Sequence, residues 1–234
     1  EEVPDNPEAY LGVSRAQKLG GNRRKALEAL ERAIALAPEF APAFLERVRL
    51  QVDDYVQMRH LCNGRVPLES EEARELRKSL ESDLARSGAR AQGSADHLYI
   101  QGMLAFSQGN YEQAEKGLAS CLALSPGEAQ GYCWRGHALV HLKRWKEAEE
   151  AYSGALEIDA GCVAALCGRG RIRRHWGDHP NSLVDYEEAV KRSPDLLAAL
   201  IGRGYGRLKT GAWEGALADG EKILQRSPGL PDAL

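Results

Sequence analysis

The stretch QGYCWRGHALVHLKRWKEAEEAYSGALEIDA, residues Gln130–Ala160, decides the fold. Its apolar residues recur every three to four positions on both sides of a polar break at Lys143–Arg144, which is the spacing of two amphipathic helices joined by a short turn. Its key residues also have counterparts 34 positions before and after it. This period predicts a chain of repeated helical hairpins rather than one globular core.

The period is clearest at three positions of five units, which begin at Pro7, Ala95, Ala129, Val163 and Leu197. The first two positions hold small residues, which let paired helices approach closely, and the third usually holds the proline that ends a helix. The eighth residues are Ser14, Gly102, Gly136, Gly170 and Gly204; the twentieth are Ala26, Ala114, Ala148, Ser182 and Ala216; the thirty-second are Pro38, Pro126, Ala160, Pro194 and Pro228.

This pattern resembles the tetratricopeptide repeat family, whose unit is a 34-residue helix–turn–helix. A 35-residue RNA-reading repeat fits less well, because its phase would slip by one residue per unit. The resemblance implies an all-α fold, a right-handed superhelical solenoid of antiparallel helix–turn–helix repeats forming a single domain over residues 1–234. The expected units are 7–40, an enlarged unit 41–94, 95–128, 129–162, 163–196 and 197–230, with 231–234 opening a truncated unit.

The enlarged unit breaks the period, because 54 residues separate Ala41 from Ala95. Helical spacing continues from Ala41 to about His60, and Cys62–Glu69 has the composition of a loop. Ser70 is a candidate N-cap for a second helix. We therefore predict one enlarged hairpin, followed by a flexible joint at Gly88–Ser94.

Composition excludes several classes of function. The net charge is −3, with 31 basic and 34 acidic residues, so bulk charge does not indicate a nucleic-acid partner. No apolar run approaches a membrane span, and no signal peptide is visible. Neither a Gly-rich phosphate loop nor a GxSxG or HExxH motif occurs, so no enzyme activity and no cofactor are expected. The five cysteines do not resemble a disulfide framework and indicate reduced thiols in a cytoplasmic protein.

The chain does not begin with Met and stops within the repeat pattern, so we expect it to be a fragment. In the family that it resembles, the first helix of each hairpin lines a concave groove. Carried over by position, this implies an apolar and aromatic section and a basic C-terminal half. Over all groove positions there are five cations, with Arg15 and Lys18 among them, against the two acids Glu8 and Asp96. The candidate groove residues are Tyr99, Met103, Phe106, His137, His141, Arg171, Arg174, His175, Tyr205 and Lys209.

Such a groove suits a protein or peptide partner with acidic residues and an apolar anchor. We therefore expect a non-enzymatic adaptor or scaffold. The alternative is the regulatory or substrate-docking region of a larger enzyme, and self-association through the terminal repeats is a third possibility. The family's carboxylate clamp is not expected, because it needs Asn on groove positions, and none of the asparagines falls on one in a regular unit.

A metal site is a competing interpretation of part of the groove. Cys133, His137 and His141 lie on one helical face, and Cys167 and His175 follow 34 residues after the first and last of them. Sulfur and imidazole suit zinc. However, eight residues of helix span about 12 Å, too far for one ion. Ordinary groove-lining side chains are therefore favoured, and no metal is expected.

Four further features receive structural interpretations. The repeated Arg135, Arg169 and Arg203 are expected to cover the seam between helices with their stems, with their heads in solvent. Trp134 and Trp176 are expected to pack in the interior. Gly220 lacks the large side chain of its counterparts, and either Trp213 or the missing next unit is a candidate to fill that space. Glu147, Glu149 and Glu150 are expected to form a solvated surface.

Overall fold

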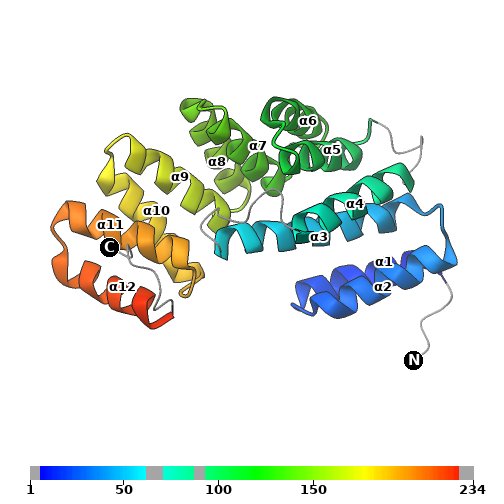
Figure 1. Cartoon of the computed structure of the whole chain (residues 1–234), viewed down its shortest axis with the longest axis horizontal. Coiled ribbons are helices and arrows are strands. Elements are labelled where there is room, and N and C mark those ends of the chain that lie inside the picture. The colour runs from blue at the N-terminus through cyan, green and yellow to red at the C-terminus, as the bar shows by residue number, and fades with distance from the viewer. Residues whose placement is uncertain (1–5, 62–70, 87–92, 227–234) are drawn as a thin grey trace. The chain divides into compact units, whose positions relative to one another are not determined.

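The computed structural model describes residues 6–61, 71–86 and 93–226 (Figure 1). These residues form twelve α-helices and no strand, so the prediction of an all-α fold is confirmed. The helices divide into two compact units, unit 1 over residues 1–124 and unit 2 over residues 125–234. The expected loop at 62–69, the Ser70 cap, most of the joint at 88–94 and the end of the last repeat lie outside the described residues. A single domain over 1–234 stays a prediction.

Unit 1 contains three helical hairpins, and each begins at a residue that opens a repeat in the sequence. The N-caps follow the expected chemistry, since Asn6 accepts the N–H of Glu8 at 2.9 Å and Ser94 accepts that of His97 at 3.2 Å. The third helix ends one residue beyond the predicted His60. The helices are α1 Pro7–Leu19, α2 Arg23–Leu36, α3 Ala41–Leu61, α4 Glu71–Arg86, α5 Ala95–Ser107 and α6 Tyr111–Leu124.

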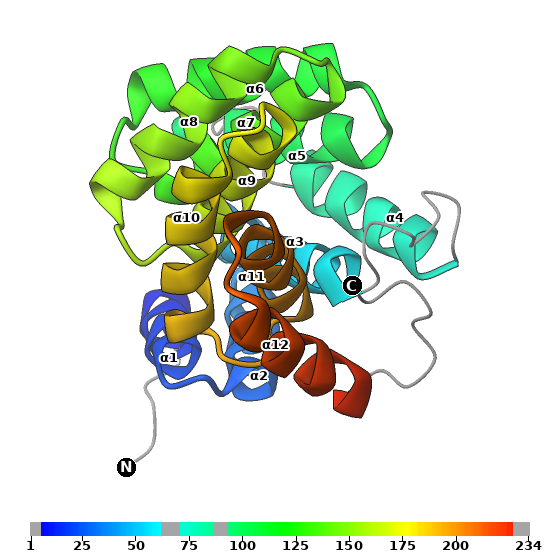
Figure 2. The ribbon, with the colours of Figure 1, turned by 90° about the vertical axis from the view of Figure 1, so that its left-hand side faces the viewer.

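Unit 2 contains three regular hairpins that follow one another at the 34-residue period. Consecutive helices run antiparallel and pack side by side, as α11 and α12 do in Figure 2. The first helix of each hairpin also contacts the first helix of the next, α7 with α9 and α9 with α11. The helices are α7 Ala129–His141, α8 Trp145–Ile158, α9 Val163–His175, α10 His179–Arg192, α11 Leu197–Thr210 and α12 Trp213–Arg226.

Two buried tyrosines explain why glycines recur on the first helices of unit 2. Tyr152 of α8 is fully buried, and a Cβ on Gly136 would lie 2.7 Å from its Cε1 atom. A Cβ on Gly168, in the next hairpin, would meet the same ring. Tyr186 is placed in the same way one repeat later. Each tyrosine therefore fills the space that glycines leave on two successive first helices, which locks neighbouring hairpins together.

The turns within hairpins repeat a left-handed backbone conformation. Gly109, Gly177 and Gly211 have φ of 80°, 80° and 84° at positions separated by one or two 34-residue periods, where glycine carries no steric penalty. At the equivalent position of the hairpin α7–α8 stands Lys143, with φ 60°. Among the described residues it is the only non-glycine with positive φ, so this turn retains a lysine at a cost in backbone strain.

The space left by Gly220 is not filled as expected. Gly220 is buried on α12, but Trp213 is 64% exposed. The prediction that its ring fills the core is therefore wrong. The large indole lies instead on the surface at the start of α12, where the helix begins at this residue.

Candidate recognition surface

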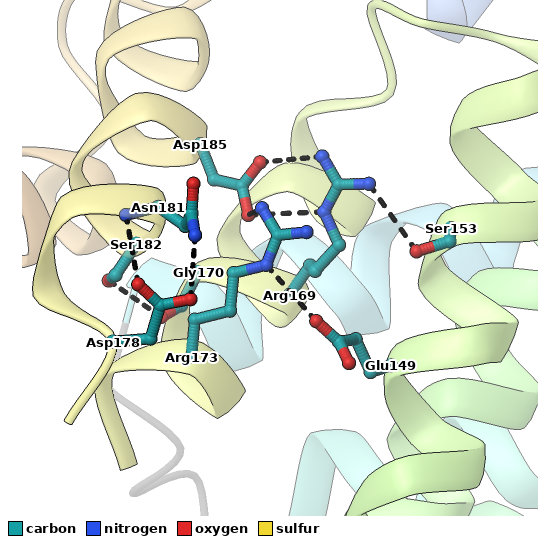
Figure 3. A network of polar contacts seen from close by, with 9 residues as sticks. All are labelled: Glu149, Ser153, Arg169, Gly170, Arg173, Asp178, Asn181, Ser182 and Asp185. Carbon is teal, nitrogen blue, oxygen red and sulfur yellow. Dashed lines mark hydrogen bonds and ion pairs between the residues drawn. The ribbon is translucent and has the colours of Figure 1, made fainter. Parts of the chain in front are cut away.

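A buried carboxylate holds three consecutive helices of unit 2 together (Figure 3). The side chain of Asp185, on α10, is 1% exposed. The guanidinium of Arg169, on α9, donates to both of its oxygens at 3.1 and 2.6 Å, and Nη1 of Arg173 donates to Oδ2 at 3.0 Å. Arg169 also donates to Ser153 Oγ and Arg173 to Glu149 Oε1, both on α8. The network fixes the position of α9 by charge-assisted bonds on two sides.

The same arrangement recurs one repeat later. Arg203 and Arg207 of α11 both bind Asp219 of α12, whose side chain is 3% exposed. In unit 1, Arg47 of α3 forms a bidentate pair with the buried Asp83 of α4. The expectation that the arginine heads lie in solvent is therefore wrong for Arg169 and Arg203, although their structural role holds.

The acidic partners had a detectable signal in the sequence. Asp185 and Asp219 are 34 residues apart, as are Arg173 and Arg207. A search for charges of opposite sign that repeat in phase would have found both pairs. Glu149 is likewise not simply a solvated surface residue, because it bonds Arg173 at 3.1 Å. Glu147 pairs with Arg144, and Glu150 is exposed.

On α9 and α11, the structure brings together cationic and aromatic side chains that the sequence assigned to the groove. The guanidinium carbon of Arg174 lies 5.2 Å from the ring centroid of Tyr205, and Lys209 Nζ lies 5.5 Å from the same centroid. Tyr205 is 36% exposed. Two cations over one exposed ring make a surface that is both basic and aromatic. We call six exposed or half-buried residues of the first helices α7, α9 and α11 the basic face: His141, Arg171, Arg174, His175, Tyr205 and Lys209.

His175 of the basic face and His137 on α7 both have aromatic partners. His175 stacks on Trp145 with ring centroids 4.8 Å apart. His137 is half-buried, and its Nδ1 lies 2.7 Å from the hydroxyl oxygen of Tyr152. Burial raises the pKa of Tyr152 well above its usual value, so the phenol stays protonated and available for this hydrogen bond. His137 is thus fixed by the core and belongs to the support of the face rather than to the face itself.

The apolar section of the predicted groove is not exposed. Tyr99, Met103 and Phe106 of α5 are only 3%, 2% and 2% exposed. The guanidinium carbon of Arg49 on α3 lies 5.2 Å from the Tyr99 ring centroid, and Phe106 packs edge-on against Tyr111. In this conformation the three side chains form part of the interior of unit 1 and offer no surface to a partner.

The predicted groove cations of unit 1 are also engaged within the unit. Lys18 Nζ lies 3.4 Å from Oε1 of Glu46, and Arg15 Nε lies 4.0 Å from its Oε2. Glu46, on α3, is 9% exposed. The acidic member of the set, Asp96, is bound by Arg49 at 2.7 Å. Glu46 therefore offsets one of the two positive charges on α1, and the side chain of Arg15 remains 61% exposed.

An open pocket of about 320 Å³ lies in unit 2 at the turn between α7 and α8. We call it the tryptophan pocket, because Trp145 and Trp176 form its apolar walls. Trp176 is 44% exposed, so the prediction that it packs in the interior is wrong, whereas Trp134 is buried at 3%. Because Trp145 also stacks on His175, the pocket adjoins the basic face. Its lining residues are Lys143, Arg144, Trp145, Lys146, Glu147 and Trp176.

The histidines and cysteines considered for zinc do not converge. Cys133 faces Cys162 at an Sγ–Sγ distance of 3.2 Å, and His137 faces Tyr152. Within the described part of the chain, no group of three or more His, Cys, Asp or Glu side chains is arranged to hold a metal ion. The described helices also include none that is both long and apolar enough to cross a bilayer.

Comparison with known proteins agrees with this geometry. A family model described as tetratricopeptide repeat matches residues 99–161. Residues 99–161 therefore carry tetratricopeptide repeats. No curated protein sequence matches it. Repeats of this family are generally non-catalytic scaffolds for protein–protein interaction.

Three solved structures share the fold at low sequence identity. PilF of Pseudomonas aeruginosa is 15% identical with a TM-score of 0.67, and the match covers 95% of this chain and 92% of that one. Cut9, from the APC/C hetero-tetramer Cut9–Hcn1, is 15% identical with a TM-score of 0.74, covering 98% and 42%. MamA is 14% identical with a TM-score of 0.51, covering 92% and 95%. These likenesses establish the architecture alone.

Proposed function

We propose that the chain is a non-enzymatic adaptor that binds an acidic segment of a partner protein on the basic face of unit 2. The observation that carries the proposal is the convergence of Arg174 and Lys209 on the exposed ring of Tyr205. Such a surface attracts carboxylates through charge and binds apolar groups through the ring. The reduced thiols are in keeping with a cytoplasmic location.

The tryptophan pocket supplies the apolar anchor site that the burial of Tyr99, Met103 and Phe106 removes from unit 1. Its walls combine indole surface with the ammonium groups of Lys143 and Lys146. A segment with an aromatic side chain flanked by Asp or Glu therefore fits both parts of the surface, with the carboxylates against Arg171 and Arg174. Aromatic anchors in such pockets typically carry much of the binding energy of an interface.

An array of acidic octapeptides tests this function, with Phe, Leu or Ser at the central position. We expect the Phe series to bind most tightly by fluorescence anisotropy, and Arg171→Glu with Arg174→Glu to weaken it by about tenfold or more, because charge reversal replaces attraction by repulsion. Lys191→Glu with Arg192→Glu, which alters the net charge equally on the second helix α10, is the matched control. Undiminished binding in the Arg171/Arg174 variant, or no binding by any acidic peptide, would remove the proposal.

A further inference from the structure

Two cysteine sulfurs of unit 2 lie within reach of each other. Cys133 is on α7 and Cys162 is the N-cap residue of α9, and their Sγ atoms are 3.2 Å apart. A disulfide bond is about 2.05 Å long, so the sulfurs need to approach by about 1.2 Å. Both side chains border the core around Tyr152. Their helices belong to successive hairpins, so a bond between them would tie one repeat to the next.

The two thiols differ in a way that assigns them different roles. Cys133 is 2% exposed and Cys162 is 7% exposed. The hydrogen bond from Cys133, together with the backbone N–H groups of Ala165 and Ala164 at the start of α9, lowers the pKa of Cys162 to about 7. The hydrogen bond to Cys162 and burial raise that of Cys133. A thiolate at a helix start beside a second thiol is the arrangement of a redox-active pair.

We propose that Cys133 and Cys162 form a modification site that a peroxide oxidises to a reversible disulfide. The Cys162 thiolate attacks one peroxide oxygen, the O–O bond breaks, and Cys162 sulfenic acid and water result. The Cys133 sulfur then attacks the sulfenic sulfur, the S–O bond breaks, and the hydroxyl leaves as water with the proton of Cys133. In total, two thiols lose two electrons and two protons, and one hydrogen peroxide becomes two waters.

Cys167, the other described cysteine of unit 2, lacks the activated thiolate. Burial raises the pKa of Cys167 to about 12, so this thiol stays protonated and unreactive. Cys121 is 1% exposed and belongs to unit 1. Cys62 lies outside the described residues. The pair Cys133 and Cys162 therefore combines proximity with an activated thiolate.

Mass spectrometry of the full chain tests the inference. Trypsin leaves Cys121 with Cys133 in peptide 117–135, and Cys162 with Cys167 in peptide 147–169. The Cys121→Ser/Cys167→Ser variant is therefore treated with hydrogen peroxide, alkylated and digested. We expect a loss of about 2 Da, a cross-link between the two peptides, and its reversal by dithiothreitol. The wild-type chain, with the bridge located by fragmentation, serves as a second measurement if this variant does not fold.

Single variants separate the two roles. In Cys133→Ser, peroxide should produce a sulfenic acid at Cys162 that dimedone captures, because no second thiol resolves it. In Cys162→Ser, Cys133 should remain a free thiol at the same dose, and Cys62→Ser should form the cross-link as wild type does. Recovery of peptides 117–135 and 147–169 unlinked, with all thiols alkylated, would overturn the proposal. A bridge that uses Cys167 or Cys121 would do the same.

Discussion

In unit 1 the two cations of the first helix α1 lie beside one buried carboxylate, whereas in unit 2 Arg174 and Lys209 lie over the exposed ring of Tyr205. Glu46 forms an ion pair with Lys18 at 3.4 Å, and its second oxygen lies 4.0 Å from Arg15 Nε. In unit 2 the buried carboxylates Asp185 and Asp219 are bound by other arginines, at positions that face the neighbouring second helices.

This difference shows how one repeat pattern produces two kinds of surface. In unit 2, one set of arginines builds the scaffold, and a second set, with Arg171 and Arg174, is available at the surface. In unit 1 the long helix α3 supplies Glu46 and Arg49, which engage charges on α1 and α5. Recognition by charge is therefore expected in unit 2, and the predictions below test that division.

The largest expected effect is on the scaffold of unit 2. Asp185→Asn leaves Arg169 and Arg173 without their buried carboxylate, so we expect the free energy of unfolding to fall by about 3–5 kcal/mol in urea denaturation. Because repeats contact mainly their neighbours, hydrogen exchange should rise in α8–α10 and stay unchanged in α1 and α2. Lys191→Gln, an exposed change on α10, is the control. A loss below about 1 kcal/mol would contradict the role of the network.

A smaller loss of stability is expected when a side chain is added against a buried tyrosine of unit 2. A Cβ on Gly202 would meet the Tyr186 ring, so Gly202→Ala should cost about 1–3 kcal/mol. Gly12→Ala is the matched change in unit 1, because nothing lies within 4 Å of its added Cβ. That variant should gain up to about 1 kcal/mol from helix propensity. Equal effects of the two substitutions in thermal unfolding would show that the tyrosine does not lock the repeats.

The strained turn at Lys143 separates stability from binding. Lys143→Gly relieves the left-handed conformation and should stabilise the chain by about 0.5–1 kcal/mol. It also removes an ammonium group from the tryptophan pocket, so the affinity for the acidic Phe peptide should fall by about two- to fivefold. Calorimetric unfolding and anisotropy measure the two effects. Tighter peptide binding in this variant would exclude the pocket from the recognition surface.

The alkylation rate of Cys162 should change with pH around neutrality, below the pH range in which an ordinary thiol ionises. Lowering its pKa to about 7 means that alkylation by iodoacetamide should rise with a midpoint near pH 7, rather than near 8.5. The titratable groups that act on it are Cys133 and Asp159, and Cys162 in turn acts on Cys167. Cys133→Ala removes the S–H group whose hydrogen bond contributes most to lowering this pKa, so the midpoint should move upward. A midpoint near 8.5 in the wild-type chain would contradict the proposed activation.

The helices and their starting residues follow from local spacing, which the sequence contains. Pro7, Ala95 and Val163 open helices where the period places them. The pairing of the buried acids Asp185 and Asp219 could also have been predicted from the sequence, because these residues follow the same 34-residue period. The burial of Phe106 and Tyr99 could not have been predicted in this way. Arg49, which covers Tyr99, lies on α3, in the segment whose length breaks the period. Side-chain exposure depends on such neighbours rather than on position within a repeat.

The tryptophan pocket was missed for a related reason. Trp176 stands where the other regular hairpins have Gln108, Leu142 and Thr210, so no periodic position predicts its environment. The Cys133–Cys162 contact joins a helix to the cap of another helix 29 residues later, a spacing that the 34-residue alignment does not bring together. Features that depart from the repeat therefore required the structure.

Two matched variants, each of which removes two positive charges from the first helix of one hairpin, test the central claim most directly. Arg171→Gln with Arg174→Gln in unit 2 and Arg15→Gln with Lys18→Gln in unit 1 each remove two positive charges. For the acidic Phe peptide, measured by anisotropy at one ionic strength, we predict about tenfold weaker binding for the unit 2 variant and less than about twofold change for the unit 1 variant. Equal losses, or a larger loss in unit 1, would contradict the assignment of recognition to the basic face.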